Sequence, residues 1–252
     1  MILAQVRDFK MFLDGKDDVM TPEILAYNCH EPAETELILS HVQVGMTFLD
    51  IGANVGYFSL LASKKLTAQG KIYAFEPEPR NYAVLTKNIT LNSAFNVMPV
   101  SKALSNHKGF SSFFLDQGNF GAHTFSALNI QTRNETSIQV EVTTLDDVVR
   151  EMGIHVDFIK MDVQGAEGLV LEKAEETLKR HRPKILMEFW PEGLRNLKTD
   201  PLALLHQLEK DYAITLVEGN GTLLAKNPDE ILRIAKQRTY VNLFCIPKSA
   251  VP

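Results

Sequence analysis

Residues 47–58 read TFLDIGANVGYF, an apolar run that ends at two closely spaced glycines and resumes as a second apolar run. The pattern predicts a buried strand over 48–51, a turn from Gly52 to Gly56 and a helix from Tyr57 onward. A strand–turn–helix of this kind directs backbone N–H groups and the positive end of a helix at the turn. Because Gly52 has no Cβ, a ligand can approach the backbone there. The stretch therefore predicts a ligand-binding turn in an α/β domain.

A second strand is predicted at Lys71–Phe75, and it ends at Glu76. An acidic residue at this position of a nucleotide-binding α/β domain hydrogen-bonds the ribose hydroxyls. The glycine pattern departs from the dinucleotide fingerprint, because Asn54 replaces the glycine that lets a pyrophosphate touch the backbone. A turn that carries side chains favours a ligand without phosphates. The D-x-G-x-x-x-G pattern starting at Asp50 resembles the first motif of class I S-adenosylmethionine methyltransferases, in which the acid lies beside the methionine part of the cofactor.

The composition is typical of a globular chain, and we expect 1–252 to form a single domain. The net charge of −5 offers no basic surface for a nucleic-acid partner. No run of about 18 apolar residues is present, so no membrane insertion is expected, and charges at Arg7 and Asp8 argue against a signal peptide. Cys29 and Cys245 lack metal-ligand spacing, and they fit free thiols in a reducing cytoplasm. We therefore expect a cytoplasmic location.

Further apolar runs alternate with helical segments along the chain. This alternation predicts βαβ units, a mostly parallel sheet of seven strands and helices on both of its faces. The last strand is expected to be antiparallel, joined to its predecessor by a glycine-containing turn and a basic stretch, Lys226–Arg238, rather than by a crossover helix. The remaining predicted strands lie at 96–100, 156–164, 184–191, 213–217 and 240–247.

The first 45 residues are predicted to form a lead-in to this core. Alternating apolar residues near Asp14-Gly15 suggest a small hairpin. Pro32 favours the first turn of a helix that runs to about His41. Because this helix directly precedes the cofactor strand, Glu31, Glu34 and Thr35 are candidates for contact with the amino-acid end of the cofactor. Glu31 and Glu34 are also explained by the preference for acidic residues at a helix N-terminus.

A second segment, 105–143, interrupts the alternation. Two strands of period two, near 108–114 and 136–142, flank a loop over 116–133 that is long enough to act as a lid. The loop contains His123, which is either an ordinary surface histidine or an acid or base that a closing lid would gate. Just before the insertion, Ser101 and Ala103 follow the third strand, at the sheet edge where an adenine would bind.

Two central strands end in polar side chains, which is unusual because buried parallel strands prefer continuous apolar runs. Asp162 ends the fourth strand and Glu188 the fifth. Lys160 either pairs with Asp162 or places a positive charge near the acceptor. Trp190 is either an aromatic residue at the rim of the site or a flat surface on which the acceptor packs. Two carboxylates at neighbouring strand ends raise each other's pKa or hold a divalent ion, so a metal is possible although none is predicted.

The chain resembles the FkbM family of S-adenosylmethionine-dependent methyltransferases over nearly its whole length, from Cys29 to Phe244. One departure is Gln164, where the family usually has glutamate. The resemblance implies the class I methyltransferase Rossmann-like fold. The segments that carry it are Glu31-Pro32 with Glu34-Thr35, LDIGANVG at 49–56, AFEP at 74–77, TLD at 144–146, IKMDVQGAE at 159–167 and PKILME at 183–188.

The resemblance implies methylation of a hydroxyl on a sugar or small natural product, with S-adenosylmethionine as donor and S-adenosylhomocysteine as product. Asp162 is the first candidate for the base, followed by Glu188 and His123. The expected partner is a small-molecule or glycan acceptor, and a homo-oligomer is possible. The predicted cofactor site comprises Glu31, Thr35, Asp50, Gly52, Asn54, Gly56, Tyr57, Glu76, Ser101, Ala103 and Asp162.

Two alternatives belong to other classes of protein. The first is an NAD-dependent oxidoreductase on the same architecture, which Asn54 in the glycine turn disfavours. The second is a non-catalytic protein that binds S-adenosylmethionine. Gln164, where the family usually has glutamate, is the residue that favours this alternative. Preferential binding of NADH would support the first, and cofactor binding without transfer to any acceptor would support the second.

Overall fold

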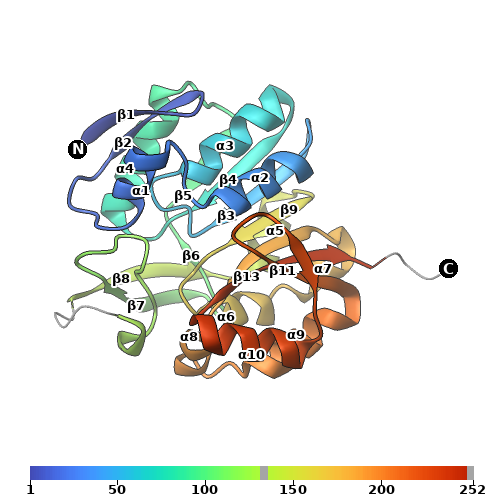
Figure 1. Cartoon of the computed structure of the whole chain (residues 1–252). Coiled ribbons are helices and arrows are strands. Elements are labelled where there is room, and N and C mark those ends of the chain that lie inside the picture. The colour runs from blue at the N-terminus through green and yellow to red at the C-terminus, as the bar shows by residue number, and fades with distance from the viewer. Residues whose placement is uncertain (131–135, 249–252) are drawn as a thin grey trace.

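An eight-stranded sheet forms the centre of the chain in the computed structural model, which describes residues 1–130 and 136–248 (Figure 1). Its strand order is β12-β11-β13-β10-β9-β3-β4-β5. The strands are β3 (Thr47–Ile51), β4 (Lys71–Phe75), β5 (Val97–Val100), β9 (Phe158–Met161), β10 (Lys184–Phe189), β11 (Tyr212–Val217), β12 (Leu223–Ala225) and β13 (Val241–Pro247).

Strand direction follows the prediction in the central part of the sheet. The five strands from β5 to β10 run parallel, and β13 lies antiparallel between β10 and β11. All seven predicted strands are present. The short edge strand β12, paired antiparallel to β11, is an eighth that the sequence did not indicate. The architecture is therefore α/β, with a mainly parallel central sheet.

The connection between the last two strands differs from the prediction. Helix α10 (Pro228–Arg238) occupies most of the stretch that was expected to lack a crossover helix. It begins with a capping box, in which Asn227 and Glu230 satisfy each other's backbone N–H groups. Ile231 and Ala235 lie four residues apart and are fully buried. The prediction was wrong because it weighed the basic residues and not the apolar residues at 231, 232, 234 and 235, whose spacing is helical.

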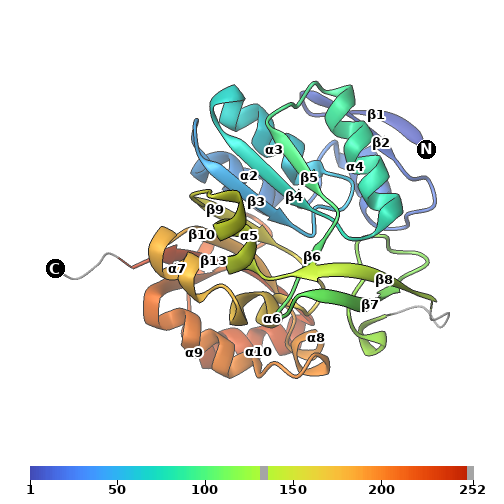
Figure 2. The ribbon, with the colours of Figure 1, turned by 180° about the vertical axis from the view of Figure 1, so that it is seen from behind.

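Helices cover both faces of the sheet because successive strand residues point in opposite directions. Phe48 packs on one face, and its neighbour Leu49 packs on the other. Figures 1 and 2 show α3 and α4 on one side of the sheet and α9 and α10 on the other. The first face carries α1 (Met20–Tyr27), α2 (Pro32–His41), α3 (Tyr57–Leu66) and α4 (Pro79–Leu91). The second carries α5 (Leu145–Met152), α6 (Glu167–Glu172), α7 (Glu175–His181), α8 (Pro191–Asn196), α9 (Pro201–Asp211) and α10.

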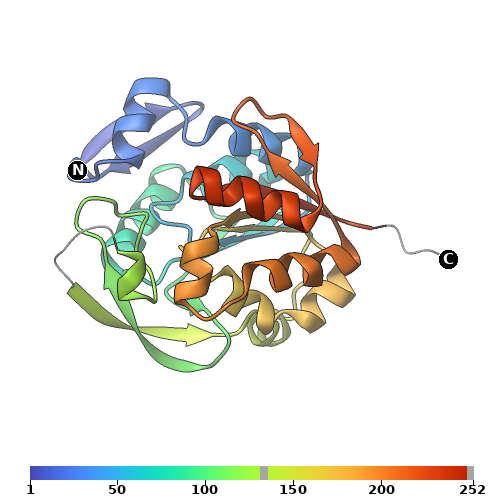
Figure 3. The same ribbon diagram turned by 60° about the horizontal axis from the view of Figure 1, so that its bottom comes forward.

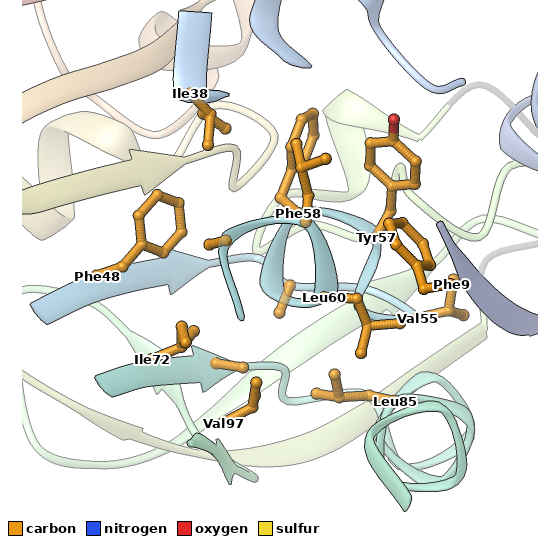
Figure 4. Packing of buried hydrophobic residues seen from close by; sticks show 14 of the residues in the cluster. Phe9, Ile38, Phe48, Val55, Tyr57, Phe58, Leu60, Ile72, Leu85 and Val97 are labelled. Carbon is orange, nitrogen blue, oxygen red and sulfur yellow. The ribbon is translucent and has the colours of Figure 1, made fainter. Parts of the chain in front are cut away.

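The two helical layers have different interiors. On the first face, Phe48 and Phe158 stack with their ring centroids 5.2 Å apart, and Ile72 and Val97 continue this apolar surface beneath α3 (Figure 4). On the second face, α8, α9 and α10 pack against one another, as the orange and red helices of Figure 3 show. Among the described helices the longest is α4 with 13 residues, and none could span a bilayer, which takes about 20.

The N-terminal lead-in is a hairpin of β1 (Ile2–Val6) and β2 (Phe9–Leu13) followed by α1 and α2. Its turn lies at Arg7-Asp8, not near Asp14-Gly15 as predicted, and Arg7 takes up a left-handed conformation there. Asn88 on α4 holds the hairpin, because its side-chain amide accepts from the N–H of Phe12 at 2.7 Å and donates to the carbonyl of Phe12 at 3.1 Å.

The insertion forms a separate three-stranded sheet of β6 (Ala103–Leu104), β8 (Thr136–Thr143) and β7 (Gly109–Leu115), seen at the lower right of Figure 2. Its small core contains Ala103, Phe113, Val140 and Val142. The loop between β7 and β8 is described as far as Ile130, and the rest of the predicted lid, to Arg133, lies outside the described residues. This loop lies over the carboxyl ends of the central strands.

Gly52 provides a test of the packing between β3 and β9. Its φ is +80°, and a Cβ at this position would overlap the backbone carbonyl oxygen of Asp162. Gly45 has a similar φ of +87° but open space around it. We expect Gly45→Ala to lower the free energy of unfolding by about 1 kcal/mol through backbone strain alone. Gly52→Ala should cost several times as much, measured by urea denaturation. Equal losses in the two variants would contradict this packing.

Candidate active site

A cavity of about 250 Å³ opens at the carboxyl ends of β3, β4, β9 and β10, beneath the insertion loop. The strand that follows β3 in the chain, β4, lies on one side of it, and the later strand β9 lies on its other side. The strand order therefore reverses at β3, and α/β sheets bind ligands at such points. The predicted site residues that line the cavity are Glu31, Gly52, Asn54, Tyr57, Glu76, Ala103, His123, Asp162 and Glu188.

Thr35, Asp50, Gly56 and Ser101 were also predicted but are not among the lining residues. Asp50 is fully buried and accepts a 2.6 Å hydrogen bond from the hydroxyl of Ser59 on α3. Thr35 is also buried, and its hydroxyl lies 3.1 Å from that of Tyr57. Ser101 is exposed to solvent. Thr35 therefore supports the lining residue Tyr57 from behind, whereas Asp50 links the end of β3 to α3.

The glycine turn and the acidic residue of the second strand are joined by a hydrogen bond. The carboxylate of Glu76 accepts from the N–H of Asn54 at 2.8 Å and from the N–H of Glu78 at 2.9 Å. Burial raises the pKa of Glu76 to about 8, although both N–H groups favour the charged form. Asn54 has a φ of 49°, a conformation that asparagine tolerates. Its Oδ1 is buried without a hydrogen-bond partner among the described residues, so it can bind a ligand.

One lysine lies among several carboxylates at the end of β9. The side chain of Lys160 is 8% exposed, with Nζ 3.7 Å from Oδ2 of Asp162 and 5.0 Å from the ring centroid of Phe58. Burial by itself would lower its pKa, but Asp162, Asp50 and Glu31 together raise it. Both sequence-based interpretations of Lys160 are therefore compatible with its position: it approaches Asp162, and it places a positive charge in the cavity wall.

The carboxylates of the cavity differ in their affinity for protons. Burial, followed by repulsion from Asp162, raises the pKa of Glu188 well above its usual range. Burial likewise raises the pKa of Glu31 to about 7, partly offset by His30. The side-chain amide of Gln164 donates a 2.7 Å hydrogen bond to Oδ1 of Asp162. A glutamate at position 164, when charged, would repel Asp162 instead of donating to it, so Gln164 orients the candidate base.

His123 lines the cavity as a neutral imidazole. Burial lowers its pKa, and its Nδ1 accepts a 3.0 Å hydrogen bond from the backbone N–H of Asp116. The proton of the neutral ring is therefore on Nε2, which can donate to a ligand but cannot accept a proton from one. This geometry favours Asp162 and Glu188 over His123 as the base.

The insertion loop is bound to the core by hydrogen bonds on two sides of the cavity. Thr124 and Asn129 donate to the carbonyl of Gln164 at 2.9 and 3.0 Å. On the opposite side, Asn81 of α4 donates to the carbonyl of Phe120 at 2.8 Å. The loop therefore forms part of the cavity wall in this structure.

Several lining residues were not predicted as site residues. His30 and Phe120 have no sequence pattern that indicates a site, although His30 precedes the predicted Glu31. Trp190 was considered only as a possible platform, and its buried indole N–H has no partner among the described residues. Tyr240, which is 48% exposed, lies at the rim. Such residues come together through the fold and not through sequence spacing.

Comparison with known proteins decides the family. The family model described as the methyltransferase FkbM domain matches residues 50–241. The chain belongs to the FkbM methyltransferase family. The matched region contains the glycine turn, Glu76, Asp162 and Glu188, so the family assignment covers most of the cavity.

Individual relatives agree with this assignment. The methyltransferase sdnD of Sordaria araneosa is 32% identical over 58% of this chain and 68% of its own length. The 2-O-methyltransferase NoeI of Sinorhizobium fredii is 32% identical over 53% of this chain and 59% of its own length. The crystal structure of methyltransferase FkbM from Methylobacillus flagellatus superposes with a TM-score of 0.51 at 15% identity, over 92% of this chain and 62% of that one, which supports the class I methyltransferase fold.

The pKa of Glu76 leads to a pH-dependent contribution to stability. A folded-state pKa of about 8 lies above the ordinary value of 4.5, so folding favours the protonated form. Glu76 therefore contributes most to the free energy of unfolding below its ordinary pKa. This contribution is lost as the pH rises from there to about 8. Between pH 6 and 9, without ligand, the free energy of unfolding of the wild type should fall by on the order of 2 kcal/mol more than that of the Glu76→Gln variant. Parallel pH profiles of the two proteins in chemical denaturation would contradict this.

Proposed function

We propose that this FkbM-family methyltransferase transfers a methyl group from S-adenosylmethionine to a hydroxyl of a sugar or small natural product. The observation that carries the proposal is the hydrogen bond between Glu76 and the backbone of Asn54. It joins Glu76, the candidate ribose-binding acid, to the glycine turn, and Glu76, Asp162 and Glu188 all line the same cavity. The candidate cofactor contacts and the candidate base thus share one cavity.

The lining residues fit S-adenosylmethionine. Glu76 would hold the ribose hydroxyls, and the open backbone at Gly52 would accommodate the part of the ligand that crosses the turn. The unpartnered Oδ1 of Asn54 supplies a hydrogen-bond acceptor that is already buried. Ala103 lies on the cavity wall beyond the third strand, where it would contact the adenine. Glu31, at the N-terminus of α2, would face the amino-acid end.

When bound, the cofactor would supply a methyl carbon attached to a sulfonium sulfur. The acceptor oxygen would bond to this carbon, and the electrons of the broken C–S bond would remain on sulfur. The protein must align the acceptor with this carbon and remove the hydroxyl proton. Asp162 accepts that proton in our proposal, because it lines the cavity and Gln164 holds its other oxygen. Glu188 lies on the adjacent strand and is the alternative acceptor for the proton.

The acceptor is inferred from the chemistry of the cavity and from one relative. Carboxylates accept hydrogen bonds from hydroxyl groups, and Trp190 and Tyr240 offer aromatic surface for a sugar ring. The name of NoeI describes it as a 2-O-methyltransferase, which supports oxygen as the acceptor atom. Nitrogen and carbon acceptors have no comparable support from these residues.

Binding of S-adenosylhomocysteine tests the cofactor assignment. We expect the protein to bind it in calorimetric titration and to prefer it to NADH. Glu76→Ala should weaken binding by about 1–3 kcal/mol, because the ribose hydroxyls lose their buried hydrogen-bond partner. Glu192→Ala, which removes an exposed carboxylate from α8, serves as the control and should bind normally. A folded protein that binds NADH but no S-adenosylhomocysteine would overturn the proposal.

Transfer of labelled methyl groups to a panel of mono- and oligosaccharides tests the base. Asp162→Asn should lower kcat by about 10²–10⁴-fold, the usual contribution of general base catalysis. Because the asparagine side chain cannot accept the proton, kcat should stay low at every pH at which the variant is folded. A variant that keeps the wild-type kcat and pH profile would exclude Asp162 and make Glu188 the base to test next.

A further inference from the structure

Three carboxylates lie close together beside the cavity, and two of them line it. Asp162, Glu167 and Glu188 each place one oxygen within 4.8 Å of the others. They come from three different elements, since Asp162 directly follows β9, Glu167 begins α6 and Glu188 lies near the end of β10. Like charges this close repel one another unless a cation or protons lie between them.

Glu167 is the residue that points to a ligand. It is fully buried, and its Oε1 accepts a 2.9 Å hydrogen bond from the N–H of Val163. Its other oxygen, Oε2, is buried and has no hydrogen-bond partner among the described residues. A buried carboxylate oxygen without a partner is costly, so this position requires a group that the side chains do not supply.

We propose that Asp162, Glu167 and Glu188 bind a divalent cation that prefers oxygen ligands, such as Mg²⁺ or Mn²⁺. The ligand type fits these ions, which are held by carboxylates and retain several water molecules. Lys160, 3.7 Å from Asp162, offsets part of the charge of the three carboxylates, and a single dication would offset the remainder. The cysteines and histidines of a typical zinc or copper site are absent from this cluster.

The placement of the three side chains gives the ion a role in methyl transfer. Asp162 and Glu188 line the cavity, whereas Glu167 does not. A cation bound by all three would therefore border the cavity, where a hydroxyl of the acceptor could reach it. A hydroxyl bound to a divalent cation loses its proton more easily, and a carboxylate oxygen of Asp162 or Glu188 that does not bind the cation would accept that proton. This role rests on the proposed function, but binding of the ion does not.

The experiment measures binding of Mn²⁺ to the full chain after treatment with a chelator, from the EPR signal of the free ion. We expect one Mn²⁺ per chain, competition by Mg²⁺ and a higher melting temperature in the presence of either ion. Glu167→Gln keeps an oxygen for the N–H of Val163 but removes the charge, and it should weaken Mn²⁺ binding by at least about tenfold. Glu188→Gln, on a partly exposed side chain, provides a second test with less risk to folding and should have the same effect.

The matched control is Glu78→Gln. Glu78 is also a buried carboxylate that accepts a backbone N–H, that of Asn81 at 2.6 Å, but it lies outside the cluster. Its variant should bind Mn²⁺ as the wild type does. Absence of Mn²⁺ binding, or equal binding by the wild type and folded Glu167→Gln and Glu188→Gln variants, would overturn the cation site and favour a proton shared among the carboxylates. Binding of S-adenosylhomocysteine in the same samples shows whether the proposed function has failed as well.

Discussion

The close approach of β3 and β9 sets the geometry of the site. The N–H of Asp162 donates to the carbonyl of Ile51 at 3.0 Å, and the absence of a side chain at Gly52 leaves room for the carbonyl of Asp162. The turn that carries the proposed cofactor contacts and the strand end that carries the candidate base are therefore packed backbone to backbone. A rigid link of this kind suits methyl transfer, because the rate depends on alignment of donor and acceptor.

The electrostatics of the cavity follow from this packing. Strand ends that bring Asp162, Glu188 and Lys160 together also remove them from water, and buried carboxylates resist ionisation. Lys160 reduces the cost by supplying one positive charge, and backbone N–H groups stabilise Glu76 and Glu167. Burial raises the pKa of Glu31 to about 7 and that of Glu76 to about 8, which is a cost to the folded protein when these groups are charged.

Sequence patterns predicted the features that depend on local chemistry. The apolar runs indicated all seven main strands, and the acid after β4 was recognised from its distance to the glycine turn. The patterns failed where the local signal is weak. Strand β12 has three half-buried or exposed residues and thus no burial pattern. Helix α10 is a different case, because Ile231, Leu232, Ile234 and Ala235 have helical spacing and the prediction weighed only the basic residues around them.

The sequence by itself determined the fold class, the position of the glycine turn and the family, because each of these depends on residues within a few positions of one another. Only the tertiary structure decided which of the polar residues face the cavity. Asp50 lies two residues before Gly52 but is buried beneath α3, whereas His30, Trp190 and Tyr240 meet in one lining from distant parts of the chain. Glu167 becomes part of a carboxylate cluster only because β9, α6 and β10 end at the same place. Side-chain direction and long-range proximity are properties of packing, and no local pattern contains them.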